Sequence, residues 1–189
     1  MKKLLVAMTL LSPLQTRAFA AKIISDKTSL KSGAEVRIVV DQGRVIVIPT
    51  NSPALSYRVE FVPSQSGWFG PKAPTSESYE NSGASYNRDK ETLTVRTGAN
   101  LNAQVTVYVP AAQSVDFRLA QGVADIGALT GRLKAFVDSG ILRYDSSALP
   151  EGSCVMAFAR HGSAHNAKES DCMEPDALLR VANGYVSAR

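Results

Sequence analysis

Alternation of apolar and polar residues with a period of two is the dominant pattern of this chain, and it predicts β-strands. In residues 57–61 the apolar side chains alternate with charged ones. The same pattern recurs in residues 93–95, 103–109, 115–119 and 133–137. Two β-branched runs, residues 36–40 and 45–48, predict strands that are buried on both faces. Helical signals are weak, and only residues 174–179, with Pro175 near their start, predict a short helical turn.

A repeated turn signal accompanies these strands. Two small or polar residues precede a glycine, and a further strand follows, at Gly43, Gly122, Gly140 and Gly184. Glycine adopts the positive φ that a sharp corner requires. Short strands joined by such corners predict an all-β fold, a β-solenoid-like stack in which each rung packs on the next. An antiparallel β-sandwich with hairpins is the alternative that the pattern leaves open.

The N-terminus predicts export. Lys2 and Lys3 precede an apolar stretch, residues 4–14, and Ala18-Phe19-Ala20 offers a cleavage site, so residues 1–20 are expected to form a secretory signal peptide. The apolar stretch is shorter than the ~20 residues of a spanning helix. We therefore expect a periplasmic or extracellular protein, with residues 21–189 forming a single β domain and no membrane-spanning segment after signal removal.

Charge and motifs narrow the classes of ligand. The net charge of +4 includes three basic residues of the predicted signal peptide, and removing them leaves about +1. The remaining charges are scattered, whereas a nucleic-acid partner needs a basic stripe. Phosphate-binding loops, calcium loops and dinucleotide fingerprints are missing from the sequence, so no cofactor is predicted.

The two cysteines of the chain, Cys154 and Cys172, predict a disulfide in an exported protein. Both histidines, His161 and His165, lie between them, so a tetrahedral zinc site is the alternative. The glycine and serine between the two histidines indicate a loop rather than a helix.

Catalysis finds little support in the sequence. No Gly-x-Ser-x-Gly elbow is present, and four aspartates on or beside predicted strands are expected to face outward: Asp116, Asp125, Asp138 and Asp145. We therefore expect a non-enzymatic protein. A carbohydrate-active β-solenoid enzyme is the alternative, because such enzymes place acids along one wall of the stack.

A long Ser-, Gly- and Pro-rich segment, residues 64–85, is expected to be a loop. Trp68 and Phe69 within it, together with Tyr79 and Tyr86, are candidate binding residues, because aromatic rings stack on sugars and grip protein surfaces. Alternatively, the first two rings cover an open end of the core.

One segment resembles a known family. A strand that ends in Val107-Tyr108-Val109-Pro110 is followed by glycine-cornered rungs in residues 115–144. This resembles the bacterial putative-adhesin family of exported envelope domains, and residues 36–48 fit the same scheme as a hairpin. The resemblance implies a β-solenoid-like fold that binds an envelope protein or glycan through its surface. It brings no catalytic residues, and a periplasmic scaffold or sensor is a further alternative.

Overall fold

The structure is a computed structural model, and it describes residues 21–31, 33–64, 73–165, 172 and 174–189. The predicted signal peptide, residues 1–20, lies outside the described residues, as do Trp68 and Phe69. No helix in the described part is long and apolar enough to cross a membrane.

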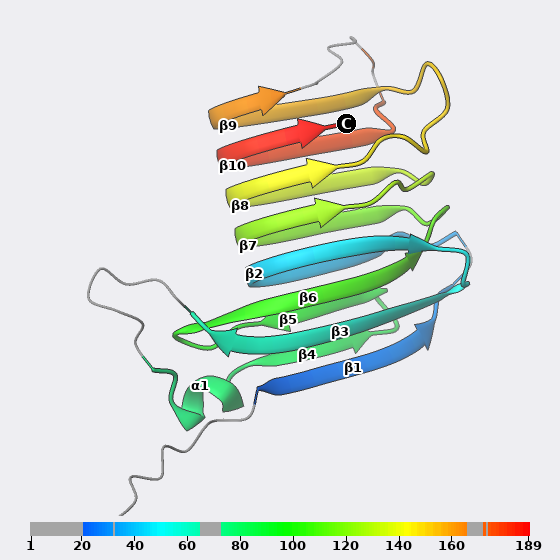
Figure 1. Ribbon diagram of the computed structural model, residues 1–189. Coiled ribbons are helices and arrows are strands. Elements are labelled where there is room, and N and C mark those ends of the chain that lie inside the picture. Colours follow the sequence, from blue (N-terminus) through cyan, green and yellow to red (C-terminus); the bar gives the residue numbers. More distant parts are fainter. Residues whose placement is uncertain (1–20, 32, 65–72, 166–171, 173) are drawn as a thin grey trace, which may run out of the picture.

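The described residues form ten strands and one short helix, which confirms the all-β class (Figure 1). In most strands every second side chain is buried, as the period-two pattern predicts. In chain order the elements are β1 (Lys22–Ser29), β2 (Val36–Thr50), β3 (Ala54–Pro63), α1 (Ser76–Glu80), β4 (Gly83–Asn87), β5 (Thr92–Arg96), β6 (Leu101–Pro110), β7 (Val115–Ile126), β8 (Leu133–Tyr144), β9 (Val155–His165) and β10 (Ala177–Ala188).

The strands form one mixed sheet in the order β1-β3-β6-β2-β7-β8-β10-β9, with β5 beside β2 and β4 beside β5. β2, β7, β8, β10 and β9 run parallel to one another, and β1, β3 and β6 pair antiparallel. Each long parallel strand bends in its middle, so its two halves lie on opposite walls around a shared core (Figure 1). The parallel register supports the solenoid-like stack rather than the antiparallel sandwich.

The bends are built from one column of glycines. In register across neighbouring strands lie Gly43, Gly122, Gly140, Gly184 and Gly162. All five have φ between +137° and +143°, and a Cβ built on Gly140 would lie 1.8 Å from the carbonyl oxygen of Gly122. The backbones therefore approach too closely at the corner for any side chain.

The last strand of the chain is not the last strand of the sheet. β10 lies between β8 and β9, so β9 forms the edge although it precedes β10 in sequence (Figure 1). The inward side chains explain this order. β10 contributes Leu179, Val181 and Val186, which are fully buried, whereas β9 contributes Val155 and small alanines. The strand with the larger inward side chains, β10, therefore lies where strands on both sides help to bury them.

Four sequence expectations need correction. Residues 36–48 are not a hairpin, because β2 continues through the Gly43 corner as one strand. The two β-branched runs alternate between the core and the outer face rather than being buried on both faces. Residues 174–179 do not form a helical turn, because β10 begins at Ala177. The helix lies instead within the predicted 64–85 loop, whose described part also contains the start of β4.

Burial of the Tyr144 hydroxyl makes stability depend on pH in the alkaline range. The ring is 1% exposed, and its hydroxyl donates to the Leu129 carbonyl at 3.2 Å. Burial, with the nearby Asp145 and Asp176 carboxylates, raises the pKa of Tyr144 to about 12 from 10.0. Because the folded-state pKa lies above that of the unfolded chain, the free energy of unfolding is not reduced by this group below pH ~10, and it falls by about 3 kcal/mol as the pH rises through ~12.

We expect Tyr144→Phe to remove this part of the pH dependence. At neutral pH the variant loses about 1 kcal/mol with its hydrogen bond. Between pH ~10 and ~12 the gap between wild type and variant narrows and then reverses, because only the wild type must bury a phenolate. Urea unfolding at several pH values measures this, and a constant gap across that range would contradict it.

Candidate functional site

Two phenylalanines stand out on the outer surface of the parallel stack. Phe136 on β8 is 38% exposed and Phe158 on β9 is 46% exposed. The phenylalanine side chains point outward because successive side chains of a strand alternate between its two faces, and the residues on either side of each phenylalanine face the core. Exposed aromatic rings on a regular sheet face are candidates for contact with a ligand.

Arg180 of β10 lies between the two rings. The sheet register pairs Arg180 with Phe136 on one side and with Phe158 on the other. Its guanidinium carbon is 6.0 Å from the centre of the Phe158 ring, within the range of a cation–π interaction. Leu178 of β10 and Met156 of β9 are in register beside this row and half-buried. We call these five residues the Phe–Arg patch.

The charge of the patch comes from Arg180. Among the described residues it forms no ion pair, whereas nearby bases do. Lys134 of β8 pairs with Glu35 at 3.4 Å, and Arg118 of β7 pairs with Asp116 at 3.5 Å. The guanidinium of Arg180 therefore keeps its hydrogen-bond donors available to a partner.

This arrangement suits one kind of chemistry. An apolar or flat group can lie on the two phenyl faces, while a carboxylate, sulfate or phosphate accepts from the guanidinium between them. The five residues of the patch include no hydroxyl, thiol or carboxylate, so a bound group would be held by ring contacts and by the guanidinium.

Comparison with known proteins supports the fold. No protein-family model matches the chain, and no curated protein matches it. A solved structure that resembles it is described as a putative cell adhesion protein from Clostridium sporogenes. The two share 9% sequence identity and superpose with a TM-score of 0.50, over 89% of this chain and 99% of the other. At this identity the likeness concerns the fold alone.

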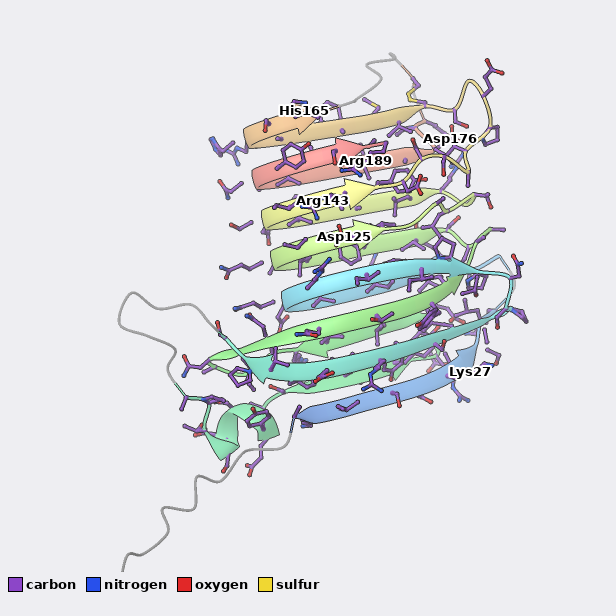
Figure 2. All side chains as sticks on the ribbon, viewed as in Figure 1. Lys27, Asp125, Arg143, His165, Asp176 and Arg189 are labelled. Carbon is purple, nitrogen blue, oxygen red and sulfur yellow. A yellow bond between two sulfur atoms is a disulfide. The ribbon has the colours of Figure 1, made fainter. Side chains whose placement is uncertain are left out.

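The four aspartates do not converge on one site. Asp116 lies on the outer wall formed by the first halves of the strands, where it pairs with Arg37 at 2.9 Å. Asp125 lies on the opposite wall, between Arg44 at 3.1 Å and Arg143 at 3.0 Å (Figure 2). Asp145 follows β8, and hydrogen bonds from Ser147 lower its pKa. Ion pairing and turn formation account for these three carboxylates, and Asp138 is exposed on β8.

The two described candidate tyrosines pack against the core. Tyr79 of α1 is half-buried, and its carbonyl accepts from the Lys22 ammonium at 2.8 Å. Tyr86 of β4 is also half-buried, and its hydroxyl donates to the Glu91 carboxylate. Burial and this hydrogen bond raise the pKa of Tyr86. Both side chains therefore pack against the core, Tyr79 from α1 and Tyr86 from β4. Their role in binding remains a prediction.

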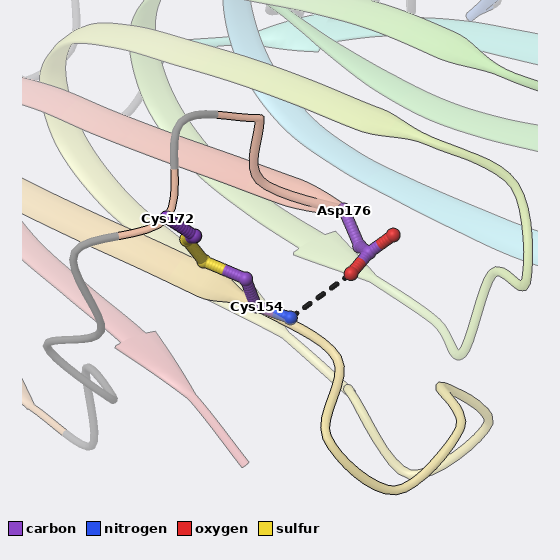
Figure 3. Close-up of a disulfide and its surroundings, with 3 residues drawn as sticks. All are labelled: Cys154, Cys172 and Asp176. Atoms are coloured by element: carbon purple, nitrogen blue, oxygen red, sulfur yellow. Dashed lines mark hydrogen bonds between the residues drawn. A yellow bond between two sulfur atoms is a disulfide. The ribbon is translucent and has the colours of Figure 1, made fainter.

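A disulfide joins Cys154 and Cys172, with their Cα atoms 6.5 Å apart (Figure 3). Both sulfurs of the alternative zinc set are therefore bonded to each other. His161 and His165 lie on β9, so the expected loop between them is wrong. Gly162 there is a corner glycine of the column rather than a loop residue. Among the described residues, no three His, Cys, Asp or Glu side chains could hold a metal ion together.

The residues of the Phe–Arg patch were not predicted from the sequence. A signal was available, because Met156, Phe158 and Arg160 alternate with Val155, Ala157 and Ala159 just before a glycine. Recognising residues 155–165 as a rung would have placed Phe158 on the outer face. That Phe158 lies beside Arg180 could not be predicted from the sequence, because it requires β10 to lie between β8 and β9 in the sheet.

Proposed function

We propose that this protein is an exported, adhesin-like β domain that binds an anionic partner at the cell envelope through the Phe–Arg patch, without catalysing a reaction. The observation that carries the proposal is the row of Phe136, Arg180 and Phe158, which aligns two exposed rings and a guanidinium that has no carboxylate partner among the described residues. The predicted signal peptide, the disulfide and the resemblance in fold to a protein described as a putative cell adhesion protein support the proposed location and class.

The rigid backbone of the stack favours this use. The three residues lie on strands, two of which have sheet neighbours on both sides, so little conformational entropy is lost when a partner binds. An apolar row with one cation at its centre has the composition of a binding hot spot, in which aromatic residues and arginine contribute most of the affinity.

A binding assay with matched variants tests this function. The domain, residues 21–189, is applied to an array of acidic and neutral bacterial polysaccharides and to immobilised envelope proteins. We expect binding to anionic members, and we expect Phe158→Ser and Arg180→Gln each to weaken it by about tenfold or more. Thr94→Ala is the control, because Thr94 lies in the same register row on β5, away from the patch.

Two results would contradict the proposal. One is binding that survives both patch substitutions in folded protein. The other is equal loss of binding in the Thr94 variant, which would indicate a general effect on the wall rather than a site.

A further inference from the structure

β9 leaves one edge of the sheet open. Among the described residues it pairs with β10 alone. The Cys154 carbonyl accepts from the Ala177 N–H at 3.2 Å, on the β10 side. Because successive residues of a strand direct their backbone groups to opposite sides, the N–H and C=O groups of Val155, Ala157 and Ala159 point away from β10. These groups can pair with a further strand.

The open edge lacks the features that usually prevent pairing. Residues 155–159 of β9 read Val-Met-Ala-Phe-Ala, without charge or proline. At the other end of the sheet β1 carries Lys22, Asp26 and Lys27, of which Lys27 is labelled in Figure 2. The Asp26 carboxylate accepts from the Lys27 N–H at 2.7 Å. Charged residues and satisfied backbone groups are how soluble proteins protect an edge. In the part of the chain that the structure describes, the β1 end of the sheet is protected in that way and residues 155–159 of β9 are not.

The first half of β9 has acidic side chains near its start and basic side chains at its end. At the start of β9 lie the exposed Glu151 and the half-buried Asp176, and the Asp176 carboxylate accepts from the Cys154 N–H at 2.9 Å (Figure 3). At the end of its first half lie Arg160 and His161, both exposed. Among the described residues neither Glu151 nor Arg160 has an ion-pair partner. An antiparallel copy of the same strand would bring each basic end against an acidic end.

We propose that this edge pairs with β9 of a second copy of the chain, antiparallel and about a two-fold axis near Ala157. In that register the outward backbone groups of Val155 meet those of Ala159 of the second copy, and Ala157 meets Ala157. On the outer face Met156 lies beside Phe158 of the second copy, a favourable sulfur–aromatic contact. The small inward alanines let the two cores meet without overlap, and a single isologous contact closes the dimer.

The dimer does not depend on the proposed binding function. The edge is used for pairing, while the outer faces of the rings stay available. Two Phe–Arg patches would lie side by side across the axis, on one continuous sheet face. A partner with repeated anionic groups would then bind both patches with increased avidity.

Sedimentation velocity over a range of concentrations, with the disulfide intact, tests the dimer. We expect the wild-type domain to sediment as a dimer and Ala157→Pro to sediment as a monomer. Proline removes one outward N–H and is tolerated at the free side of an edge strand. Arg160→Glu should raise the dimer Kd by about tenfold, and adding Glu151→Arg should restore it, because the two reversed charges again attract.

Hydrogen exchange provides a readout that does not need the proline variant to fold. The amides of Val155, Ala157 and Ala159 should become protected as the protein concentration rises, while those of β1 do not change. A wild-type protein that stays monomeric at ~100 µM, or a dimer whose formation leaves these amides unprotected, would overturn the proposal.

A control separates this proposal from the binding function. Phe136→Ser lies on β8, two strands from the edge, so it should weaken partner binding without changing the dimer. Loss of binding in a variant that still dimerises would implicate the patch alone, and a wild-type protein that is monomeric but still binds would contradict only the dimer.

Discussion

Replacing Gly140 with alanine is expected to lower the free energy of unfolding by about 4 kcal/mol, among the largest effects of any single substitution in this chain. The added Cβ would lie 1.8 Å from the Gly122 carbonyl oxygen, and the atoms in contact are backbone that cannot move aside. The φ of +140° is also unfavourable for any residue with a side chain. Because Gly140 lies between Gly122 and Gly184, the substitution would push β8 away from both β7 and β10 at the corner.

Gly83→Ala is the matched control for this experiment. Gly83 lies at the start of β4, where a Cβ has nothing within 4 Å and φ is not positive. We expect a change within about 0.5 kcal/mol, since the substitution touches no neighbour. Urea unfolding of both variants measures the difference. Equal effects at the two positions would mean that the corner tolerates a side chain.

Loss of the disulfide is expected to have the second largest effect. Cys154 and Cys172 are separated by 18 positions, and the loop that they close contains all of β9. In the chain-entropy model a loop of this length contributes about 3 kcal/mol. For a domain of this size that corresponds to a fall in Tm of roughly 6–12 °C.

A double Cys154→Ala, Cys172→Ala variant tests this, with the wild type in dithiothreitol as the comparison. Its Tm should fall by that amount, and it should be insensitive to dithiothreitol, whereas the wild type should fall to the same value when reduced. Exchange of the β9 amides should also accelerate more than that of β7, because the bond lies at the start of the edge strand. An unchanged Tm would show that the loop is already restricted by the sheet.

Side-chain periodicity was sufficient to predict the rungs with large inward residues. The alternation in β7 and β8 is regular, and a glycine marks each corner, so both strands and their bends could be predicted. In β9 the glycine and serine between His161 and His165 were interpreted as a loop, because the alanines at two of its inward positions give too weak an apolar signal to indicate a strand there. A corner glycine was therefore recognised only where the strands beside it had large apolar residues.

Strand order was beyond the reach of local patterns. The glycine positions of β9 and β10 fit the same register, so the sequence permits either strand to follow β8. Only the larger inward side chains of β10 favour it over β9 as the neighbour of β8. To compare the side chains of the two segments, both must first be recognised as rungs. For the same reason the row of Phe136, Arg180 and Phe158 could not be assembled from residues that are adjacent in the sequence.

The interior position of β10 also affects when the stack can be completed. A protein chain is synthesised from its N-terminus, so β9 emerges before β10, the strand that must separate it from β8. The rung beside β8 therefore cannot be filled correctly until the final residues have been made. A nick or stop before residue 177 would likewise remove an internal layer and leave β9 attached through the wrong neighbour or not at all.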